Sequence, residues 1–114
     1  MPRKPRFYLP GVPAHVVQQG NSQQAVFFAE QDYAAYLAWL REAAHEHECR
    51  LHAYVLMTNH VHLLVTPQSR ESISRTIQHI GRYYVSYFNR RYGKSGTLWE
   101  GRHKGCPVSD QIGK

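Results

Sequence analysis

The sequence has no apolar run long enough to cross a membrane, which argues against a membrane-spanning protein. Its basic start, residues 1–11, is not followed by the apolar stretch and small-residue cleavage site of a secretory signal. Only two cysteines occur, Cys49 and Cys106, and they lie too far apart to form a metal-binding spacing. Reduced thiols in a cytoplasmic protein are the expectation that follows.

The chain also lacks internal repeats, low-complexity tracts and any linker between domains. Its 114 residues are enough for one domain with a modest hydrophobic core. The apolar content of 42% is too high for a disordered chain. We therefore expect a single domain over residues 1–114.

Charge is unevenly distributed along the chain. Residues 1–57 contain five Lys or Arg and five Asp or Glu, whereas residues 58–114 contain nine and three. The whole net charge of +6 therefore belongs to the second half. A basic half beside a neutral half favours a polyanionic partner, nucleic acid first, although an ordinary solvated basic face would give the same count.

The first half predicts a strand followed by a helix. Residues 15–18 are a short β-branched run that ends at the turn signal Gln19-Gly20-Asn21. Over residues 31–47 the side chains of one stripe recur at intervals of three and four, and Asp32 suits the first turn. The stripe consists of Tyr33, Tyr36, Leu37, Leu40, Ala43, Ala44 and His47.

Two strand-like runs follow, over residues 51–57 and 61–66. They are joined by Thr58-Asn59-His60, and Pro67 closes the second run. Because the joint is so short, an antiparallel hairpin is favoured.

Residues 72–92 predict a second helix. Gly93 follows it, and glycine suits the left-handed conformation found just after a helix. The apolar face consists of Ile73, Ile77, Ile80, Tyr84 and Phe88. The order strand, helix, strand, strand, helix predicts an α+β fold, a ferredoxin-like or RNA-recognition-motif-like antiparallel sheet with helices packed on it. Such scaffolds host many functions, so the fold decides none of them.

The strongest local signal is the pair His60 and His62, separated by one apolar residue. Alternate residues of a strand project from the same side, so the two imidazoles can converge on one cation or one phosphate. Two histidines need a third ligand to make a metal site, and ordinary surface histidines are the alternative. The other histidines considered, His45, His47, His52, His79 and His103, show no ligand spacing with one another and are interpreted as structural or exposed.

Four segments carry a resemblance to a known family. They are His15-Val16-Val17-Gln18-Gln19-Gly20-Asn21, Met57-Thr58-Asn59-His60-Val61-His62-Leu63-Leu64, Gly81-Arg82-Tyr83-Tyr84-Val85-Ser86-Tyr87-Phe88-Asn89 and Gly96-Thr97-Leu98-Trp99-Glu100-Gly101-Arg102. In this order they resemble the REP-associated tyrosine transposases, relatives of the single-tyrosine, histidine–hydrophobic–histidine transposases of small insertion sequences. The match runs from about Arg6 to Lys104, nearly the whole chain.

The resemblance implies a ferredoxin-like sheet, a divalent cation (Mg²⁺ or Mn²⁺) and a single-stranded DNA substrate that contains a hairpin. His60 and His62 match the metal-ligand pair of the family motif, position for position. In such proteins a tyrosine hydroxyl attacks a phosphodiester, which gives a 5′-phosphotyrosine link and a free 3′-OH.

The sequence departs from the family after Lys104. The family's nucleophile lies in a later helix, in a segment that leads to Asn-Pro and also supplies the third metal ligand. Here no tyrosine follows Tyr92 and no Asn-Pro occurs. We therefore expect the nucleophile to lie beyond Lys114, the chain being a truncated domain that is inactive as it stands. Four tyrosines lie in or near the second helix, and none matches the nucleophile's position: Tyr83, Tyr84, Tyr87 and Tyr92.

Basic residues of the second half are the expected DNA contacts, because Lys and Arg bind phosphates and position a strand without reading its sequence. The set is Arg82, Arg90, Arg91, Lys94, Arg102 and Lys104. An exposed tyrosine or Trp99 would stack on unpaired bases. For each residue taken singly, solvated surface is the alternative.

Three hypotheses follow from these observations. The chain takes part in metal-dependent nicking and joining of hairpin DNA, or it binds hairpin DNA and cuts nothing, or it is an unrelated RNA-binding α+β domain. Loss of a terminal helix would uncover part of the sheet or a strand edge, so pairing with a second copy as a homodimer is also expected.

Overall fold

The computed structural model describes residues 8–101 and 103–108. In chain order the elements are β1 (Ala14–Gln19), the 3₁₀ turn η1 (Asn21–Gln23), α1 (Glu30–Glu46), β2 (Cys49–Met57), β3 (His60–Pro67), α2 (Ser72–Tyr92) and β4 (Lys104–Pro107). The first three strands and both helices fall where the sequence predicts them, within two residues at each end.

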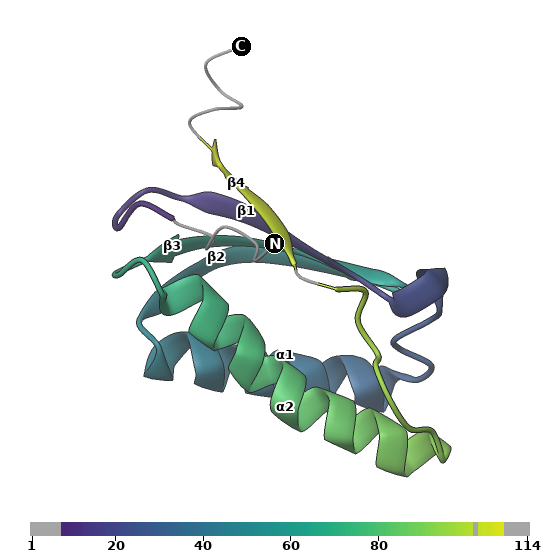
Figure 1. Cartoon of the computed structure of the whole chain (residues 1–114). Helices are drawn as coiled ribbons and strands as arrows, with labels where there is room; N and C mark the ends of the chain where they lie inside the picture. Colours follow the sequence, from purple (N-terminus) through teal and green to yellow (C-terminus); the bar gives the residue numbers. More distant parts are fainter. Residues whose placement is uncertain (1–7, 102, 109–114) are drawn as a thin grey trace.

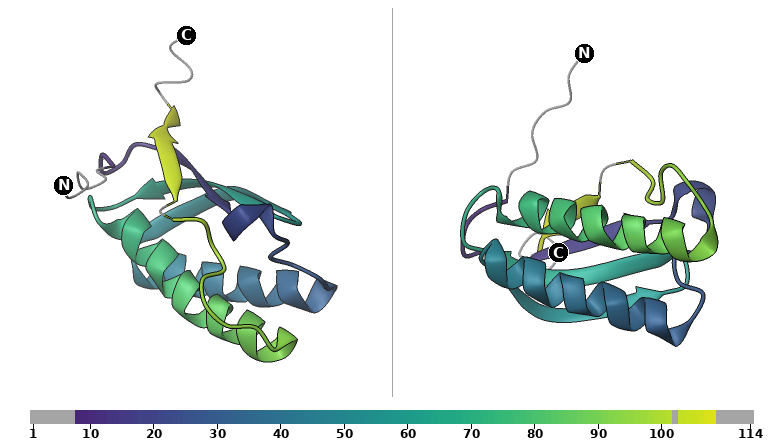
Figure 2. Two further views of the ribbon diagram at one scale, coloured as in Figure 1. Left: turned by 45° about the vertical axis from the view of Figure 1, so that its right-hand side comes forward. Right: turned by 90° about the horizontal axis from the view of Figure 1, so that it is seen from below.

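The four strands form one antiparallel sheet in the order β2-β3-β1-β4. Both helices lie on the same face of this sheet (Figures 1 and 2). This is the ferredoxin-like α+β arrangement that the sequence predicts. No described element covers the opposite face, which is called the open face below. The two helices together are called the helix layer.

Strand β4 is the element that the sequence analysis missed. It is only four residues long, Lys-Gly-Cys-Pro, and it carries no β-branched or alternating apolar pattern. It exists because the backbone of β1 offers it a partner, with His15 opposite Cys106 and Val17 opposite Lys104. Proline is tolerated at the end of such an edge strand because an edge residue can do without one ladder donor.

The hairpin of β2 and β3 differs slightly from the prediction. His60, expected in the joint, is the first residue of β3 and pairs with Met57, so the joint has only two residues. Pro67, expected after the strand, is its last residue and pairs with Cys49. His60 therefore belongs to the strand itself. Because strand side chains alternate, it lies on the same face of β3 as His62.

Helix α2 buries the whole stripe that the sequence predicts, and α1 buries four of its seven stripe residues, Tyr36, Leu40, Ala43 and Ala44. All five apolar residues of the α2 stripe are buried, and Tyr36 and Leu40 of α1 are fully buried. Gly93 ends α2 in the left-handed conformation, with φ of 63°. Within the described ranges, no helix combines the length and the apolar composition that crossing a membrane requires.

Trp99 corrects one prediction. It was expected to be available for stacking on a base, but only 7% of it is exposed, and it packs against Tyr36 and Tyr84. The chain around Trp99 pairs with the end of β1. Trp99 forms an isolated antiparallel β-bridge with Gly20, and the Glu100 N–H donates a hydrogen bond to the Gln19 carbonyl. The helix layer shields the Trp99 indole from water. This burial depends on helix packing and cannot be predicted from the local sequence.

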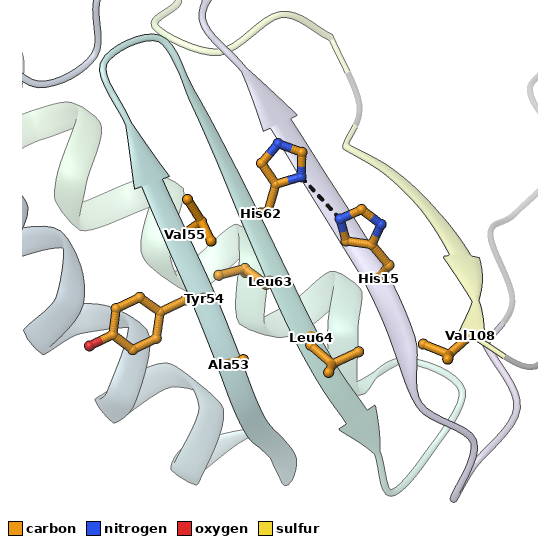
Figure 3. A pocket seen from close by; sticks show the side chains of 8 residues that line it. All are labelled: His15, Ala53, Tyr54, Val55, His62, Leu63, Leu64 and Val108. Atoms are coloured by element: carbon orange, nitrogen blue, oxygen red, sulfur yellow. Dashed lines mark hydrogen bonds between the residues drawn. The ribbon is translucent and has the colours of Figure 1, made fainter. Parts of the chain in front are cut away.

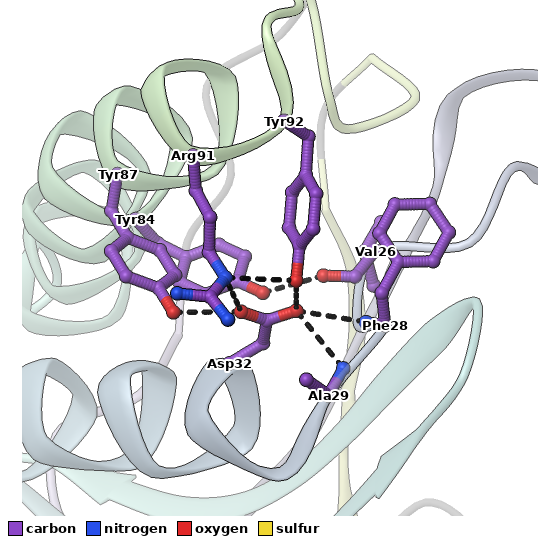
Figure 4. Close-up of polar contacts among 8 residues, drawn as sticks. All are labelled: Val26, Phe28, Ala29, Asp32, Tyr84, Tyr87, Arg91 and Tyr92. Atoms are coloured by element: carbon purple, nitrogen blue, oxygen red, sulfur yellow. Dashed lines mark hydrogen bonds and ion pairs between the residues drawn. The ribbon is translucent and has the colours of Figure 1, made fainter.

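Asp32 fastens the start of α1 to the end of α2 (Figure 4). Its carboxylate is fully buried and accepts hydrogen bonds from the backbone N–H groups of Phe28 and Ala29, at 2.9 and 3.1 Å. The hydroxyls of Tyr87 and Tyr92 also donate to it. Burial acts to raise the pKa of Asp32, but these donors outweigh it and the pKa is lowered. The predicted role of Asp32 in the first turn of α1 is confirmed, with α2 as an additional partner.

Candidate functional site

His60 and His62 project from β3 onto the open face. Val61 between them is fully buried beneath the sheet, so the alternation of this strand is strict. The rings of His60 and His62 lie 4.9 Å apart, centroid to centroid, and are nearly perpendicular. Their cross-strand neighbours on this face are Gln19 and Val17 in β1 and Met57 and Val55 in β2. As the spacing predicts, the two imidazoles share one side of a rigid strand.

A third imidazole, from His15 of β1, lies beside His62 (Figure 3). Its Nε2 lies 3.0 Å from Nδ1 of His62, and the two rings are stacked at 5.2 Å. In the register of the sheet, His15 pairs with Leu64 and so reaches diagonally toward His62. Sequence analysis placed His15 in a family motif but gave it no role in the site, because the register of β1 against β3 joins residues 47 positions apart.

Hydrogen bonds orient both β3 imidazoles. Nδ1 of His60 lies 2.8 Å from Oδ1 of Asn59, which can only accept, so Nδ1 carries the proton and Nε2 keeps its lone pair. In the pair of His62 and His15 either ring can donate. When Nδ1 of His62 donates to His15, Nε2 of His62 is left with a lone pair as well. Outer partners of this kind typically hold metal-binding histidines in one tautomer.

The surroundings of His62 favour its neutral form. The pKa of His62 is lowered, first by partial burial and then by the neighbouring imidazoles of His60 and His15. A neutral imidazole is the form that binds a cation. The lowered pKa of His62 therefore favours its cation-binding form.

An open, mainly apolar hollow of about 350 Å³ adjoins the imidazoles on this face. It is lined by His15, Ala53, Tyr54, Val55, His62, Leu63, Leu64 and Val108. Figure 3 shows His15 and His62 at one side of this hollow and Leu64 and Val108 at another. The side chain of Tyr54 points away from the imidazoles in the same view. The open face thus combines polar ring nitrogens with an apolar floor.

The structure separates the basic residues that were expected to act together. Lys104 is exposed in β4, where it pairs with Val17 of β1. Because Val17 pairs with His62 on its other side, Lys104 lies two strands from His62. Arg82, Arg90, Arg91 and Lys94 instead belong to α2 or follow it, on the covered side of the sheet. Arg91 lies 3.5 Å from the Asp32 carboxylate. Arg102 is outside the described residues.

The tyrosines of α2 are also on the covered side. Tyr84 is fully buried, as predicted, and Tyr87 donates to Asp32. Burial and the Asp32 acceptor raise the pKa of Tyr87 to about 12, which opposes formation of a phenolate. Tyr83 is exposed and stacks on Trp39 of α1. None of these four tyrosines, Tyr92 included, lies on the face that carries His60.

Two solved structures share the fold of this chain. One is a REP-associated tyrosine transposase bound to a REP hairpin, with a TM-score of 0.70 and 16% identity over 99% of this chain and 67% of that chain. The other is a candidate transposase from Deinococcus radiodurans R1, with a TM-score of 0.70 and 22% identity over 97% of this chain and 92% of that chain. At these identities the likeness establishes the fold. Among curated proteins, none matches the chain significantly.

Sequence comparison gives the family directly. The family model described as IS200-like transposase matches residues 9–112. This range contains all four strands, both helices and the three clustered histidines of the open face. The chain therefore belongs to the IS200-like transposase family.

Proposed function

We propose that this chain binds single-stranded hairpin DNA on its open face, as part of metal-assisted DNA nicking and joining. The observation that carries the proposal is the convergence of His60 and His62 on an uncovered sheet face, with His15 holding the second ring. Membership in a transposase family and the fold shared with a REP-hairpin-bound transposase support DNA as the partner.

His60 and His62 supply two imidazole donors suited to a divalent cation, which needs at least one further ligand. His60 and His62 would hold it through Nε2, because the Nδ1 atoms of both rings have partners of their own. A divalent cation in this place would polarise a DNA phosphate and stabilise the charge that develops on it. Mg²⁺ and Mn²⁺ were the expected ions, and of these Mn²⁺ accepts imidazole nitrogen more readily.

The remaining side chains of the open face suit a nucleotide. Lys104 offers a positive charge for a phosphate near the imidazoles. The apolar floor beside His62 offers contact area for a base or a sugar. The arginines of α2 would contact the DNA only if the strand passes around the edge of the sheet.

Covalent strand transfer requires a tyrosine hydroxyl beside the DNA phosphate that is attacked. The hydroxyl oxygen would form a bond to phosphorus, the bond from phosphorus to the 3′ oxygen would break, and the proton would pass to that oxygen as the 3′-OH. Tyr84 is buried, and Tyr87 and Tyr92 donate to Asp32 on the covered side. We therefore propose that these tyrosines of α2 do not serve as the nucleophile and that this chain binds hairpin DNA without cutting it.

The test is binding of a fluorescent single-stranded hairpin oligonucleotide with and without Mn²⁺. We expect Mn²⁺ to tighten binding by the wild-type chain, and the double variant His60→Ala/His62→Ala to lose this gain. His52→Gln is the matched control, since His52 is exposed in β2 and contacts Thr66 rather than the cluster. Binding that Mn²⁺ leaves unchanged, or a double variant that behaves as wild type, would refute the site.

A denaturing gel of the same mixtures separates the alternatives. A covalent protein–DNA adduct would assign nicking to this chain and overturn the proposal that its own tyrosines are inert. Salt-sensitive binding without an adduct supports the binding module. Tighter binding of hairpin RNA than of hairpin DNA would instead favour an RNA-binding domain, through contacts to the 2′-OH.

Self-association belongs to the same proposal. Val55 and Met57 of β2 are exposed on the open face. Strand β2 is also an edge strand of the described sheet, and the backbone of an edge strand can pair with another chain. We propose that the single domain formed by residues 1–114 pairs with a second copy along this edge. A sedimentation experiment that finds only monomer at high protein concentration would contradict it.

A further inference from the structure

A second histidine cluster lies in the helix layer. Glu46 is the last residue of α1, His47 caps that helix, and His79 comes from the middle of α2. Nε2 of His47 is 3.1 Å from Nδ1 of His79, and each of these nitrogens is 3.9 Å from an oxygen of Glu46. Packing of the helices thus unites histidines 32 positions apart, which the sequence analysis interpreted as structural or exposed.

The donor atoms are spaced as the ligands of a small tetrahedral cation. Metal–ligand bonds of about 2.0–2.2 Å to nitrogen and oxygen at tetrahedral angles place neighbouring ligand atoms about 3.3–3.5 Å apart. The two imidazole nitrogens are slightly closer to each other than this, and each lies 3.9 Å from a different oxygen of Glu46. With one ligand atom taken from each residue, the three donors lie within 4.8 Å of one another, and the Glu46 side chain is exposed.

Glu42 completes the arrangement from one turn earlier in α1. Its Oε2 lies 3.3 Å from Nε2 of His79, so that nitrogen donates and Nδ1 of His79 faces the cluster with its lone pair. A carboxylate that accepts from the far nitrogen of a ligating histidine is the usual outer support of a zinc site. His79 is 10% exposed and is held in this orientation by the helices.

The surrounding charge also favours a cation. The cluster lies at the C-terminus of α1, where the helix dipole is negative. Glu42 and Glu46 add two carboxylates. An open hollow of about 200 Å³ leads to the donor atoms, so an ion and a water molecule can enter. Arg75 and Arg82 line the same hollow, and Arg75 is paired with Glu71 at 3.0 Å.

We propose that Glu46, His47 and His79 form a Zn²⁺ site that joins α1 to α2. Two imidazoles and one carboxylate, with a fourth position left for water, are a ligand set that Zn²⁺ favours over Mg²⁺ or Mn²⁺. The site is chemically distinct from the open-face cluster, which consists of three imidazoles as far as residues 8–101 and 103–108 show. Its role is to lock the end of α1 against α2.

The test uses the full chain carrying His15→Gln, His60→Gln and His62→Gln, so that the open-face imidazoles do not contribute. Titration with ZnCl₂ against a chromophoric chelator is expected to give one equivalent of tight binding and a rise in the melting temperature. In this background His47→Asn or His79→Asn should weaken Zn²⁺ binding at least 100-fold, and Glu42→Gln by about 10–100-fold. His45→Asn is the control, since His45 is exposed on α1 outside the cluster.

Two measurements keep the outcome unambiguous. Circular dichroism of each apoprotein shows whether the variant folds. If His79→Asn does not fold, His47→Asn still tests the site, because His47 lies at a half-buried helix end. X-ray absorption of the zinc-loaded chain should report two imidazoles and light oxygen ligands. No stoichiometric Zn²⁺ binding in the triple-variant background, or binding that survives His47→Asn, would overturn the proposal. Neither result bears on DNA binding, so the two proposals fail independently.

Discussion

The two faces of the sheet present histidines in opposite chemical settings. On the open face, His15, His60 and His62 lie among aliphatic side chains, and none of the described carboxylates contacts them. On the covered side, His47 and His79 lie at a helix junction beside Glu42 and Glu46. The same residue type thus forms an exposed cluster suited to a cation shared with a phosphate, and a carboxylate-supported cluster suited to a cation that the protein keeps.

The difference teaches how each face obtains its rigidity. His60 and His62 both belong to β3, and the alternation of side chains along that strand sets the directions of both rings without contacts to the helices. The covered side depends on contacts between elements, above all on Asp32, which ties the start of α1 to the end of α2. A change in the helix layer should therefore cost stability, whereas a change on the open face should cost binding.

Asp32→Ala should give the largest loss of stability. It leaves two backbone N–H groups and two tyrosine hydroxyls without their acceptor, so we expect a loss of about 3–5 kcal/mol in the free energy of unfolding. Urea denaturation measures it. Glu30→Gln, an exposed change in the same helical turn, should stay within about 0.5 kcal/mol. Equal effects of the two variants would break the contrast between the faces.

Acid should weaken the helix layer through the same carboxylate. The pKa of Asp32 is lower in the folded chain than in the unfolded chain, so its contribution is fully present above the unfolded value of about 4. It is lost as the pH falls through the folded pKa. Thermal melts of wild type and Asp32→Asn from neutral to acid pH should show a smaller pH dependence in the variant. A parallel decline in both proteins would assign the acid sensitivity to other groups.

His15→Gln should sharpen the comparison from the open side. Because His15 holds His62 by a 3.0 Å hydrogen bond, we expect about a 10-fold weaker Mn²⁺ dependence of hairpin binding. The melting temperature should change little, since His15 is only half buried. Hairpin titrations at several Mn²⁺ concentrations measure this, with His52→Gln as control. A large loss of stability with unchanged Mn²⁺ dependence would make His15 a structural residue.

Lys104→Gln should give the smallest effect, a change in how hairpin DNA binding depends on salt concentration. Removal of one phosphate contact lowers the slope of log K against log salt concentration by about one. Arg90→Gln in α2 should leave the slope unchanged, because Arg90 lies on the covered side and contacts Ser86. If Arg90→Gln lowers the slope and Lys104→Gln does not, the DNA lies along the helix layer instead.

Much of the fold follows from local pattern, and the exceptions have physical causes. The stripe of α2 and the alternation of β3 predict which side chains are buried, because helical and strand periods differ. Strand β4 escapes prediction because its four residues have little intrinsic preference and form a strand only beside β1. Trp99 escapes for a similar reason, since its burial depends on Tyr36 and Tyr84 from two different helices.

By itself, the sequence determined that His60 and His62 share one side of a strand, because a period of two is a property of any extended backbone. It also determined the family through the order of its motifs. Only the tertiary structure decided that His15 joins that pair, that His47 and His79 meet, and that the basic residues of α2 lie away from Lys104. Each of these depends on strand register or helix packing, where residues distant in the chain meet because their elements bury a common core.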